Sequence, residues 1–329
     1  MNRNRNFLQL FEEANAIDRT GAEALIPVQE THEIIQGAIA ASAVLTRGRK
    51  LPNMTSNKTK MPVLDMLPIA YFVNGDTGRK KLTKMQWANK YINAEEIAVI
   101  VPIPEAVLDD ADYDIWGEVK PRLMEAFGAK IDGAIIFNEE KPSTWRDGII
   151  ATATAAGAVV TQGTVGDKHD LYDDIMADGG LISKIEASGY MPNGHIADIS
   201  MRAKLRGLRL DNGQPIFKHD VQGATNYALD GSPMYFPVNG SYDKTQALMI
   251  SGDFSQLVYS IRQDITYKIF TEGVVQDPST GEIIYNLMQN DMVALRAVMR
   301  LGWEIPNPIN ALKTDKTQRC PFAILKAGA

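Results

Sequence analysis

The feature that most constrains this fold is a long helix predicted between Asp109 and Asn138. Apolar residues recur there at every fourth position, which places them in one stripe along a helix. The stripe consists of Ile115, Val119, Leu123, Phe127, Ile131 and Ile135. An unbroken helix of roughly 25 residues would be close to 40 Å long, at about 1.5 Å per residue. Pro121 lies inside the pattern and predicts either a kink or a helix that begins at this residue.

Acidic residues crowd the start of this helix. Between Glu105 and Glu118 there are six acidic residues and no basic one. Carboxylates at a helix start accept hydrogen bonds from free N–H groups and interact favourably with the positive end of the helix dipole. The six residues are Glu105, Asp109, Asp110, Asp112, Asp114 and Glu118.

Residues 60–92 predict a long β-hairpin. Met61–Val73 is apolar on both alternating faces, and Thr83–Tyr91 alternates between apolar and polar residues. The sequence NGDTGRKK between them supplies turn residues. Pro62 and Pro68 cannot donate to a ladder, so the first strand should lie at an edge.

This hairpin is too long to remain uncovered. Thirteen extended residues reach about 43 Å at roughly 3.3 Å each, whereas a compact body of this size has a radius of gyration near 20 Å. Because an isolated two-stranded hairpin is marginally stable in water, it must fold back on its own subunit or lie on a neighbour.

The distribution of charge favours a hairpin that lies on a neighbouring copy. Lys58–Ile92 contains seven basic residues against Asp65 and Asp76, a net charge of 7 − 2 = +5. A basic loop and an acidic helix start in one chain suit a head-to-tail contact between copies. The alternative is that both are solvated surfaces, since exposed ion pairs contribute only about 0–1 kcal/mol. The predicted contact residues on the hairpin are Arg79, Lys80, Lys81, Lys84 and Trp87, and the six acidic residues are their predicted counterparts.

The later chain predicts a mixed domain and then long strands. Glu95–Ile103 is predicted as a buried strand, and EEKPSTWRDG after Asn138 as a domain boundary. Tyr259–Ile269 and Val293–Trp303 alternate as two strands, each with one apolar face that the stripe of the long helix would cover, and QDPSTGE forms a turn between them. Further predictions are a helix over Leu171–Ala187 that Gly179 and Gly180 split, a helix over His195–Leu205 and a short strand over Tyr235–Val238.

The overall composition restricts the class of protein. A chain of 329 residues suits about two domains. It carries a formal charge of −6 with a pI near 5.4, and it has no polybasic tail of the kind that holds DNA by neutralising phosphates. A single cysteine, Cys320, excludes an internal disulfide framework, and there is no apolar run of about 18 residues. We therefore expect a soluble protein that is made in the cytoplasm.

No motif predicts catalysis. The loop GTVGDKHD lacks the spacing of a phosphate-binding loop, and GxGxxG and GxSxG are absent. His169, Asp170, Asp173 and Asp174 lie close together, but they lack an established metal-ligand spacing and are better explained as an acidic helix start. We predict no catalytic, cofactor-binding or metal-binding residue. A soluble α/β enzyme whose site assembles only in space remains the alternative.

Several collinear stretches resemble the major capsid protein of tailed bacteriophages, the HK-ninety-seven-type shell fold that encapsulins share. The order and spacing of these stretches carry the resemblance, from about Thr20 to the carboxyl end. The stretches are VPIPEAVLDDA (101–111), IDGAII (131–136), SGDFSQLVYSIRQDITY (251–267) and NDMVALRAVMRLGW (290–303), with NPINAL (307–312) where that family closes its chain.

The resemblance implies an α+β fold with named parts. Residues 1–53 would be the N-terminal arm, 54–95 the extended E-loop hairpin, and 96–148 the P-domain with its spine helix. Residues 149–248 would form the mixed α/β A-domain, 249–303 the P-domain strands, and 304–329 the return to the A-domain.

The same resemblance implies the function. Copies of the chain would assemble in the host cytoplasm into hexamers and pentamers of an icosahedral head, enclosing double-stranded DNA without sequence-specific contacts. The implied partners are a scaffolding protein and a portal, with a decoration protein as a further candidate and no membrane. An encapsulin shell around a cargo enzyme is the related alternative. Some relatives cross-link a lysine of the E-loop to a neighbour's asparagine; Lys80, Lys81 or Lys84 with Asn307 or Asn310 are imaginable pairs, but no motif identifies them and we predict no such bond.

Overall fold

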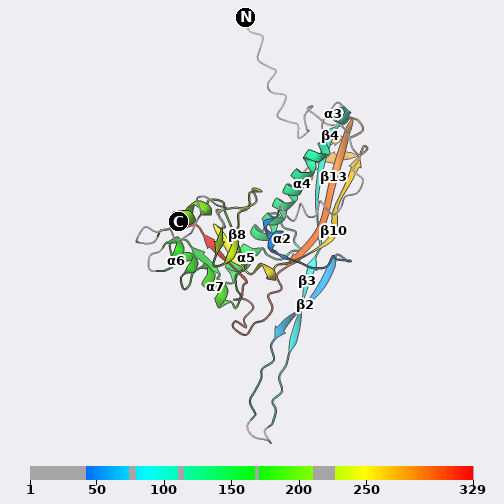
Figure 1. Ribbon diagram of the computed structural model, residues 1–329. Helices are drawn as coiled ribbons and strands as arrows, with labels where there is room; N and C mark the ends of the chain where they lie inside the picture. The colour runs from blue at the N-terminus through cyan, green and yellow to red at the C-terminus, as the bar shows by residue number, and fades with distance from the viewer. Residues whose placement is uncertain (1–41, 74–78, 110–114, 167–169, 210–226, 329) are drawn as a thin grey trace. The chain divides into compact units, whose positions relative to one another are not determined.

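The computed structural model describes residues 42–73, 79–109, 115–166, 170–209 and 227–328 (Figure 1). These residues belong to two compact units. Described residues within Glu96–Met124 and Gln263–Arg300 belong to the first unit. Those within Ala38–Glu95, Glu125–Arg262 and Leu301–Ala329 belong to the second unit. The structure contains both helices and sheets, and the sheets combine antiparallel with parallel pairs, in agreement with the predicted α+β class.

Long neighbouring strands form the basis of the first unit. They are β4 (Glu95–Pro104), β13 (Met292–Glu304) and β10 (Val258–Phe270), and β13 lies between β10 and β4 in the order of their sheet. β13 is buried along nearly its whole length, whereas β4 alternates between exposed and half-buried residues. The predictions of one apolar face for β13 and of a buried β4 were therefore wrong. The reason lies in position, because β13 has a strand on each side and β4 ends the sheet order.

A short ribbon lies between β10 and β13 in the sequence. β11 (Val274–Gln276) pairs antiparallel with β12 (Ile283–Asn286), and α3 (Glu105–Asp109) follows β4 in the same unit. The predicted turn is present, since the Gly281 N–H donates to the Asp277 carbonyl at 2.9 Å. Leu287, Met292 and Ala294 form a small buried cluster beside the ribbon.

The predicted long helix is confirmed over its described length. α4 (Ile115–Asp132) continues directly into η1 (Gly133–Phe137), a π-helical segment that ends at Asn138 with a left-handed φ of 64°. Leu123, Phe127, Ile131 and Ile135 of the apolar stripe are buried. Pro121 lies within α4, so the helix does not begin at the proline.

The second unit contains a six-stranded sheet whose strands come from distant parts of the sequence. Its strand order is β5-β14-β9-β6-β8-β7, so the last strand in sequence, β14, lies between β5 and β9. Helices α5 (Ile149–Ala155) and α7 (Leu181–Ala187) pack against β14, and the Phe254 and Phe322 rings meet edge to face at 5.2 Å. The strands are β5 (Val159–Thr161), β6 (Gly194–Ala197), β7 (Ala228–Leu229), β8 (Ser232–Tyr235), β9 (Met249–Gly252) and β14 (Phe322–Lys326).

Short helices surround this sheet, and two sequence predictions change here. The predicted split at Gly179 and Gly180 is confirmed. The helix predicted over His195–Leu205 is wrong in its first half, because β6 is hydrogen-bonded to β8 on one side and β9 on the other. The strand predicted over Tyr235–Val238 ends at Tyr235. The helices are α5 (Ile149–Ala155), α6 (Leu171–Met176), α7 (Leu181–Ala187) and α8 (Met201–Gly207), with a 3-10 turn, η2 (Phe254–Gln256).

The predicted hairpin is present as a separate two-stranded sheet. β2 (Lys58–Met66) pairs antiparallel with β3 (Gln86–Asn93), and Pro62 lies opposite Asn89 on a strand with one neighbour, as predicted. The ladder ends at Met66, so the predicted strand Met61–Val73 was too long. An irregular register between Leu64 and Met66, followed by Pro68, which has no N–H to donate, accounts for the early end.

The root of the hairpin is closely packed. Ile92 is buried with Met54 and Val258, and α2 (Ala43–Arg47) and β1 (Arg49–Lys50) precede the hairpin in the chain. A Cβ at Gly302 would lie 2.4 Å from the Asn93 carbonyl oxygen, so only glycine fits where β13 passes the end of β3. Within the described ranges, no helix has both the length and the apolar content needed to cross a membrane.

Candidate assembly interface

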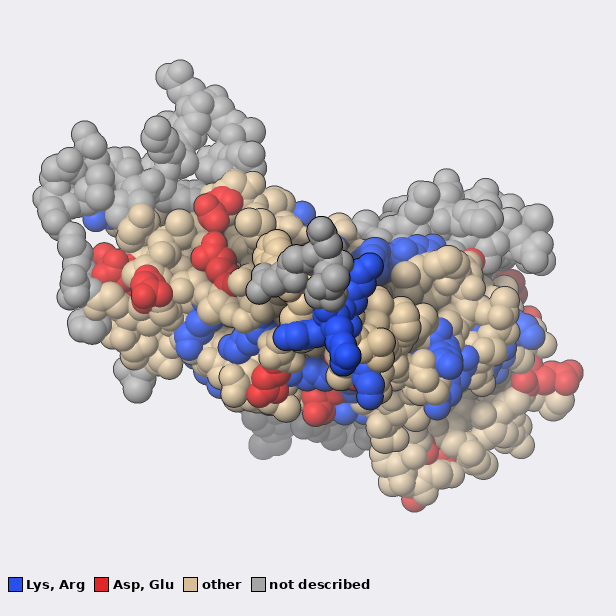
Figure 2. Space-filling view, turned by 90° about the horizontal axis from the view of Figure 1, so that it is seen from below, with Lys and Arg blue, Asp and Glu red and all other residues tan. Residues whose placement is uncertain are grey.

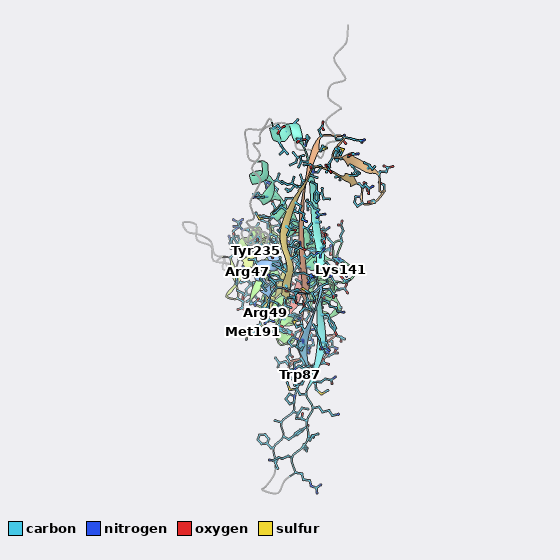
Figure 3. The ribbon with its side chains drawn as sticks, turned by 90° about the vertical axis from the view of Figure 1, so that its right-hand side faces the viewer. Arg47, Arg49, Trp87, Lys141, Met191 and Tyr235 are labelled. Carbon is cyan, nitrogen blue, oxygen red and sulfur yellow. The ribbon has the colours of Figure 1, made fainter. Side chains whose placement is uncertain are left out.

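The outer part of the hairpin leaves large apolar side chains in solvent. Phe72 and Leu82 are almost fully exposed, and Trp87 on β3 is 58% exposed. Folded proteins rarely leave a contiguous apolar surface uncovered unless it binds something. We call this surface the outer hairpin surface; it consists of Met66, Ile69, Tyr71, Phe72, Val73, Leu82, Met85, Trp87 and Tyr91. Figure 3 labels Trp87 on the hairpin.

Basic side chains accompany these apolar residues. The predicted contact residues Arg79, Lys80, Lys81 and Lys84 are all exposed, and Figure 2 shows Lys and Arg side chains gathered in the view along the hairpin. The Lys81 ammonium lies 4.9 Å from the centroid of the Tyr71 ring, a cation–π distance. Across the described residues, no acidic side chain forms an ion pair with these four cations.

The structure describes the acidic counterparts only in part. Glu105 and Asp109 are exposed at the two ends of α3. Asp110, Asp112 and Asp114 lie outside the described residues, and Glu118 is in α4 without a described side chain. The pairing of basic hairpin and acidic helix start therefore stays a prediction.

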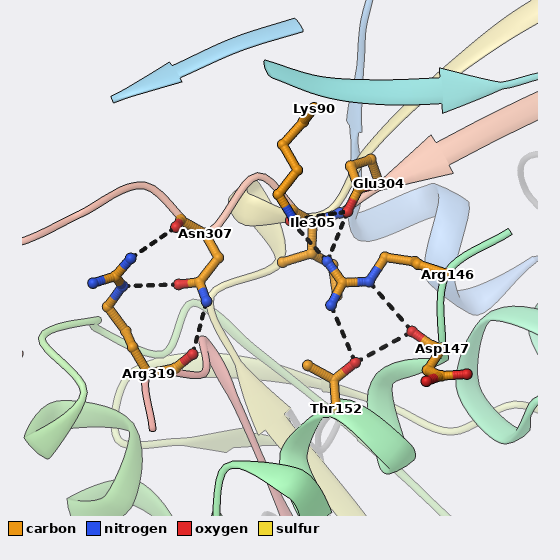
Figure 4. Close-up of polar contacts among 8 residues, drawn as sticks. All are labelled: Lys90, Arg146, Asp147, Thr152, Glu304, Ile305, Asn307 and Arg319. Carbon is orange, nitrogen blue, oxygen red and sulfur yellow. Dashed lines mark hydrogen bonds and ion pairs between the residues drawn. The ribbon is translucent and has the colours of Figure 1, made fainter. Parts of the chain in front are cut away.

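A polar network that the sequence did not predict holds the segment after β13 (Figure 4). The Arg146 guanidinium donates to Glu304 Oε1 at 2.7 Å and to the Ile305 carbonyl at 2.8 Å. Lys90 Nζ of β3 lies 3.8 Å from the same carboxylate oxygen. Arg146 belongs to the predicted polar connector, so no local pattern distinguished it from a surface arginine.

A buried arginine organises the following loop. Arg319 is only 1% exposed, and its guanidinium donates to the carbonyls of Asn307 at 2.9 Å and Lys313 at 2.8 Å. Its Nε–H donates to Asn307 Oδ1 at 3.0 Å. Because buried carbonyls need donors, this side chain fixes a stretch that has neither helix nor strand.

The amide groups of the two asparagines named for cross-linking are used inside the chain. Asn307 Oδ1 accepts from the Tyr190 hydroxyl at 2.8 Å, and Asn307 Nδ2 donates to the Arg319 carbonyl. Asn310 Nδ2 donates to the Ser188 carbonyl, and its Oδ1 accepts from the Lys313 N–H, each at 2.8 Å. These contacts give both residues a structural role.

A buried carboxylate connects the end of α4 to α2. Asp132 accepts from the Ser42 hydroxyl at 2.6 Å, from the backbone N–H groups of Ala43 and Val44, and from Asn239 Nδ2. Burial raises the pKa of Asp132 above its ordinary value, and these hydrogen bonds oppose the rise. The group stabilises the start of α2, and solvent does not reach it.

The acidic cluster at α6 is also structural. The Asp170 side chain accepts from the Asp173 N–H at 2.8 Å, as a helix cap does, and the Asp174 carboxylate accepts from the N–H groups of Gly163, Thr164 and Val165. His169 lies outside the described residues. Among the residues that the structure describes, no group of at least three His, Cys, Asp or Glu side chains could hold a metal ion.

Cys320 and His195, the remaining candidates among the described residues, are buried. Burial raises the pKa of the Cys320 thiol to about 11, so the thiol stays protonated near neutral pH. Burial lowers the pKa of His195 to about 4, and its ring nitrogens contact the Ser251 hydroxyl at 2.7 Å and the Leu229 carbonyl at 3.1 Å. His32 and His219 lie outside the described residues.

Comparisons with known proteins agree with this arrangement. Residues 22–316 match the phage capsid family. The chain is 26% identical over 298 residues to the major capsid protein of Staphylococcus phage 80alpha, covering 90% of this chain and 86% of that protein.

Solved structures show the same fold. A chain from Microbacterium phage Oxtober96 is 33% identical, with a TM-score of 0.75 over 93% of this chain and 96% of that one. A chain from Mycobacterium phage Bobi is 30% identical, with a TM-score of 0.73 over 88% and 91% of the two chains. The capsid of an empty GTA particle shares the fold alone, at 17% identity and a TM-score of 0.60 over 95% and 96% of the two chains.

Proposed function

Because this chain belongs to the phage capsid family, we propose that each copy builds the shell by laying its hairpin on the adjoining copy. The protein is a major capsid protein of a tailed bacteriophage and a component of the virion capsid. Membership of the family assigns it a structural role, and the shell is made from copies of the chain itself.

The observation that carries the proposal is the outer hairpin surface. Phe72, Leu82 and Trp87 are exposed, and no described part of the chain covers them. Apolar area contributes roughly 25 cal/mol per Å² when another surface removes it from water, so a neighbour would supply the strength of the contact. The basic residues beside these side chains would set register and partner orientation.

A hairpin that binds a different surface on the next copy makes a head-to-tail contact. Such contacts close into rings when the rotation between copies closes, and hexamers and pentamers are the rings that an icosahedral head needs. On this proposal residues 54–95 act as the E-loop, 96–148 and 249–303 as the P-domain, and 149–248 with 304–329 as the A-domain. Residues 1–53 act as the arm.

The proposal extends to the other components of the head. A scaffolding protein would direct assembly in the host cytoplasm, a portal would occupy one vertex, and a decoration protein would bind the finished shell. The enclosed double-stranded DNA would make no sequence-specific contact, because a net charge of −6 suits a container that does not grip its genome. Strong, salt-sensitive DNA binding by isolated subunits would contradict this part.

The test reverses charge on either side of the proposed contact. One variant carries Lys80→Glu and Lys81→Glu, and the other carries Glu105→Lys and Asp109→Lys. Each should form fewer rings or particles, whereas a chain that carries all four substitutions should assemble, because every altered loop then meets an altered helix start. Size-exclusion chromatography and negative-stain microscopy measure both results.

The unaltered chain provides the reference for this test. Hollow particles or capsomer rings support the proposal. A wild-type chain that stays monomeric would contradict shell formation. A chain with all four substitutions that assembles no better than the two variants would contradict the pairing of loop and helix start. Lys204→Glu with Lys244→Glu, which changes the charge by the same amount away from the hairpin, is the matched control.

A further inference from the structure

The root of the hairpin borders a pocket of about 480 Å³ within the second unit. Val63, Asp65 and Lys90 line it from the hairpin, and Ala155 lines it from α5. Asn307 and Lys316 line it from the segment 306–318, which we call the strap. The pocket opens to solvent, so the hairpin root has space on one side.

The inner end of the hairpin is firmly attached. The Trp145 indole N–H donates to the Asn93 carbonyl at 3.1 Å, and Asn93 Nδ2 donates to the Thr144 carbonyl at 3.0 Å. Ile92, next to Asn93, is fully buried. These contacts fix one point of the hairpin, where Lys58 pairs with Asn93.

The strap is also fixed, but to the other side of the pocket. Arg319 holds its carbonyls, and Asn310 hydrogen-bonds the Ser188 carbonyl at the end of α7. The strap reaches the hairpin through the Ile309 N–H, which donates to the Leu64 carbonyl at 3.1 Å, and through an ion pair between Lys316 and Asp65. Near the inner end of the strap, Lys90 faces Glu304 at 3.8 Å (Figure 4).

The contacts at Leu64 and Asp65 determine the direction of the hairpin because they lie far from its fixed root. They lie six or seven residues along β2 from Lys58, which is about 20 Å at roughly 3.3 Å per residue. A weak bond far from a pivot resists rotation better than the same bond close to it. With that contact broken, the pocket gives the hairpin room to rotate about its root.

We propose that the Asp65–Lys316 ion pair is a latch that holds the hairpin against the strap, and that the hairpin swings over the pocket when the latch opens. The Lys316 and Asp65 side chains are 52% and 25% exposed, so salt and a docking neighbour both reach them. The latch rests on the proposed function in one respect, since the direction of the hairpin decides whether it meets a neighbour.

The test measures the direction of the hairpin in full-length subunits kept below the concentration at which they assemble. Spin labels at Leu82→Cys on the hairpin and Ala187→Cys on α7 report the distance between them by pulsed electron paramagnetic resonance. Both positions are exposed, and Cys320 is buried and leaves labelling to the introduced pair. Asp65→Asn and Lys316→Gln should each broaden the distance distribution.

Charge exchange separates a latch from a general loss of structure. Asp65→Lys combined with Lys316→Asp should restore the narrow distribution. Lys130→Gln, which removes an exposed ion pair with Glu140 that does not border the pocket, should leave it unchanged. Adding Ala155→Trp to Asp65→Asn should narrow the distribution again, because the indole fills the pocket.

Hydrogen exchange gives an independent readout. The Ile309 amide should exchange up to about fivefold faster in Asp65→Asn, because this is the largest change in an equilibrium that the loss of one exposed ion pair produces. An unchanged distance distribution in both single variants, or broadening that the exchanged pair does not reverse, would overturn the latch. Particle formation by the wild-type chain is scored separately, so failure of the latch and failure of shell assembly give different results.

Discussion

The hairpin and the six-stranded sheet of the second unit place similar side chains in opposite environments. Phe322 of β14 is fully buried, whereas Phe72 in the hairpin is fully exposed. The sheet surrounds its apolar residues with α5, α7 and neighbouring strands, and the outer hairpin has no such cover among the described residues. The sheet therefore stabilises the subunit, whereas the hairpin leaves apolar surface exposed, which our proposal assigns to contact with another copy.

The two phenylalanines test this difference most strongly. Phe322→Ala should lower the free energy of unfolding by about 3–5 kcal/mol, because it leaves a cavity beside Phe254. Phe72→Ala should change it by less than about 0.5 kcal/mol and should instead reduce particle yield. Urea denaturation measures the free energy of unfolding of both variants, and electron microscopy measures their particle yield. A large loss of stability in Phe72→Ala would show that the hairpin is covered by its own subunit.

His195 makes the stability of the sheet depend on pH. Burial lowers its folded pKa to about 4, below the ordinary value of 6.5, so the unfolded chain binds the proton more tightly. The neutral His195 side chain contributes about 3 kcal/mol to the free energy of unfolding above about pH 6.5, and this contribution is lost as the pH falls toward 4. Denaturation of wild type and His195→Gln at several pH values isolates this loss, and equal pH dependence in both proteins would rule it out.

Gly302 tests the junction between the hairpin and β13. A Cβ there would lie 2.4 Å from the Asn93 carbonyl oxygen, so Gly302→Ala should cost about 1–3 kcal/mol through overpacking. Calorimetry should show a lower melting temperature. Gly207→Ala, where a Cβ meets open space, is the control, and equal melting temperatures for the two variants would contradict a tight junction.

The smallest effect on stability is expected at the hairpin surface. Lys81→Ala should change the free energy of unfolding by less than about 0.5 kcal/mol, since Lys81 is exposed. A lower salt concentration should suppress assembly of this variant than of the wild type, because the contact has lost one cation. Particle yield across a salt series measures this shift. An unchanged salt dependence would show that Lys81 takes no part in the contact.

Periodic and local signals predicted much of this fold. The four-residue spacing of the stripe gave the long helix, and Gly179 with Gly180 gave the break between α6 and α7. Pro62 correctly indicated a strand with one neighbour. These signals work because helix spacing, glycine and proline act through the local backbone.

Predictions failed where contacts between distant residues decide the structure. Gly194–Ala197 forms a strand because β8 and β9 pair with it, and four residues are too few to show a period. Arg146 and Glu304 are 158 positions apart, and nothing near either residue indicates the other. Burial of Arg319 likewise depends on how the strap folds back on itself.

The most direct measurement replaces residues 67–85 with an Asn-Gly turn that joins Met66 to Gln86, which already face each other in the ladder. The account predicts a subunit with the melting temperature of the full chain that forms no closed particles by electron microscopy. Closed shells built by the trimmed protein would contradict the central claim, and so would a trimmed protein that no longer folds.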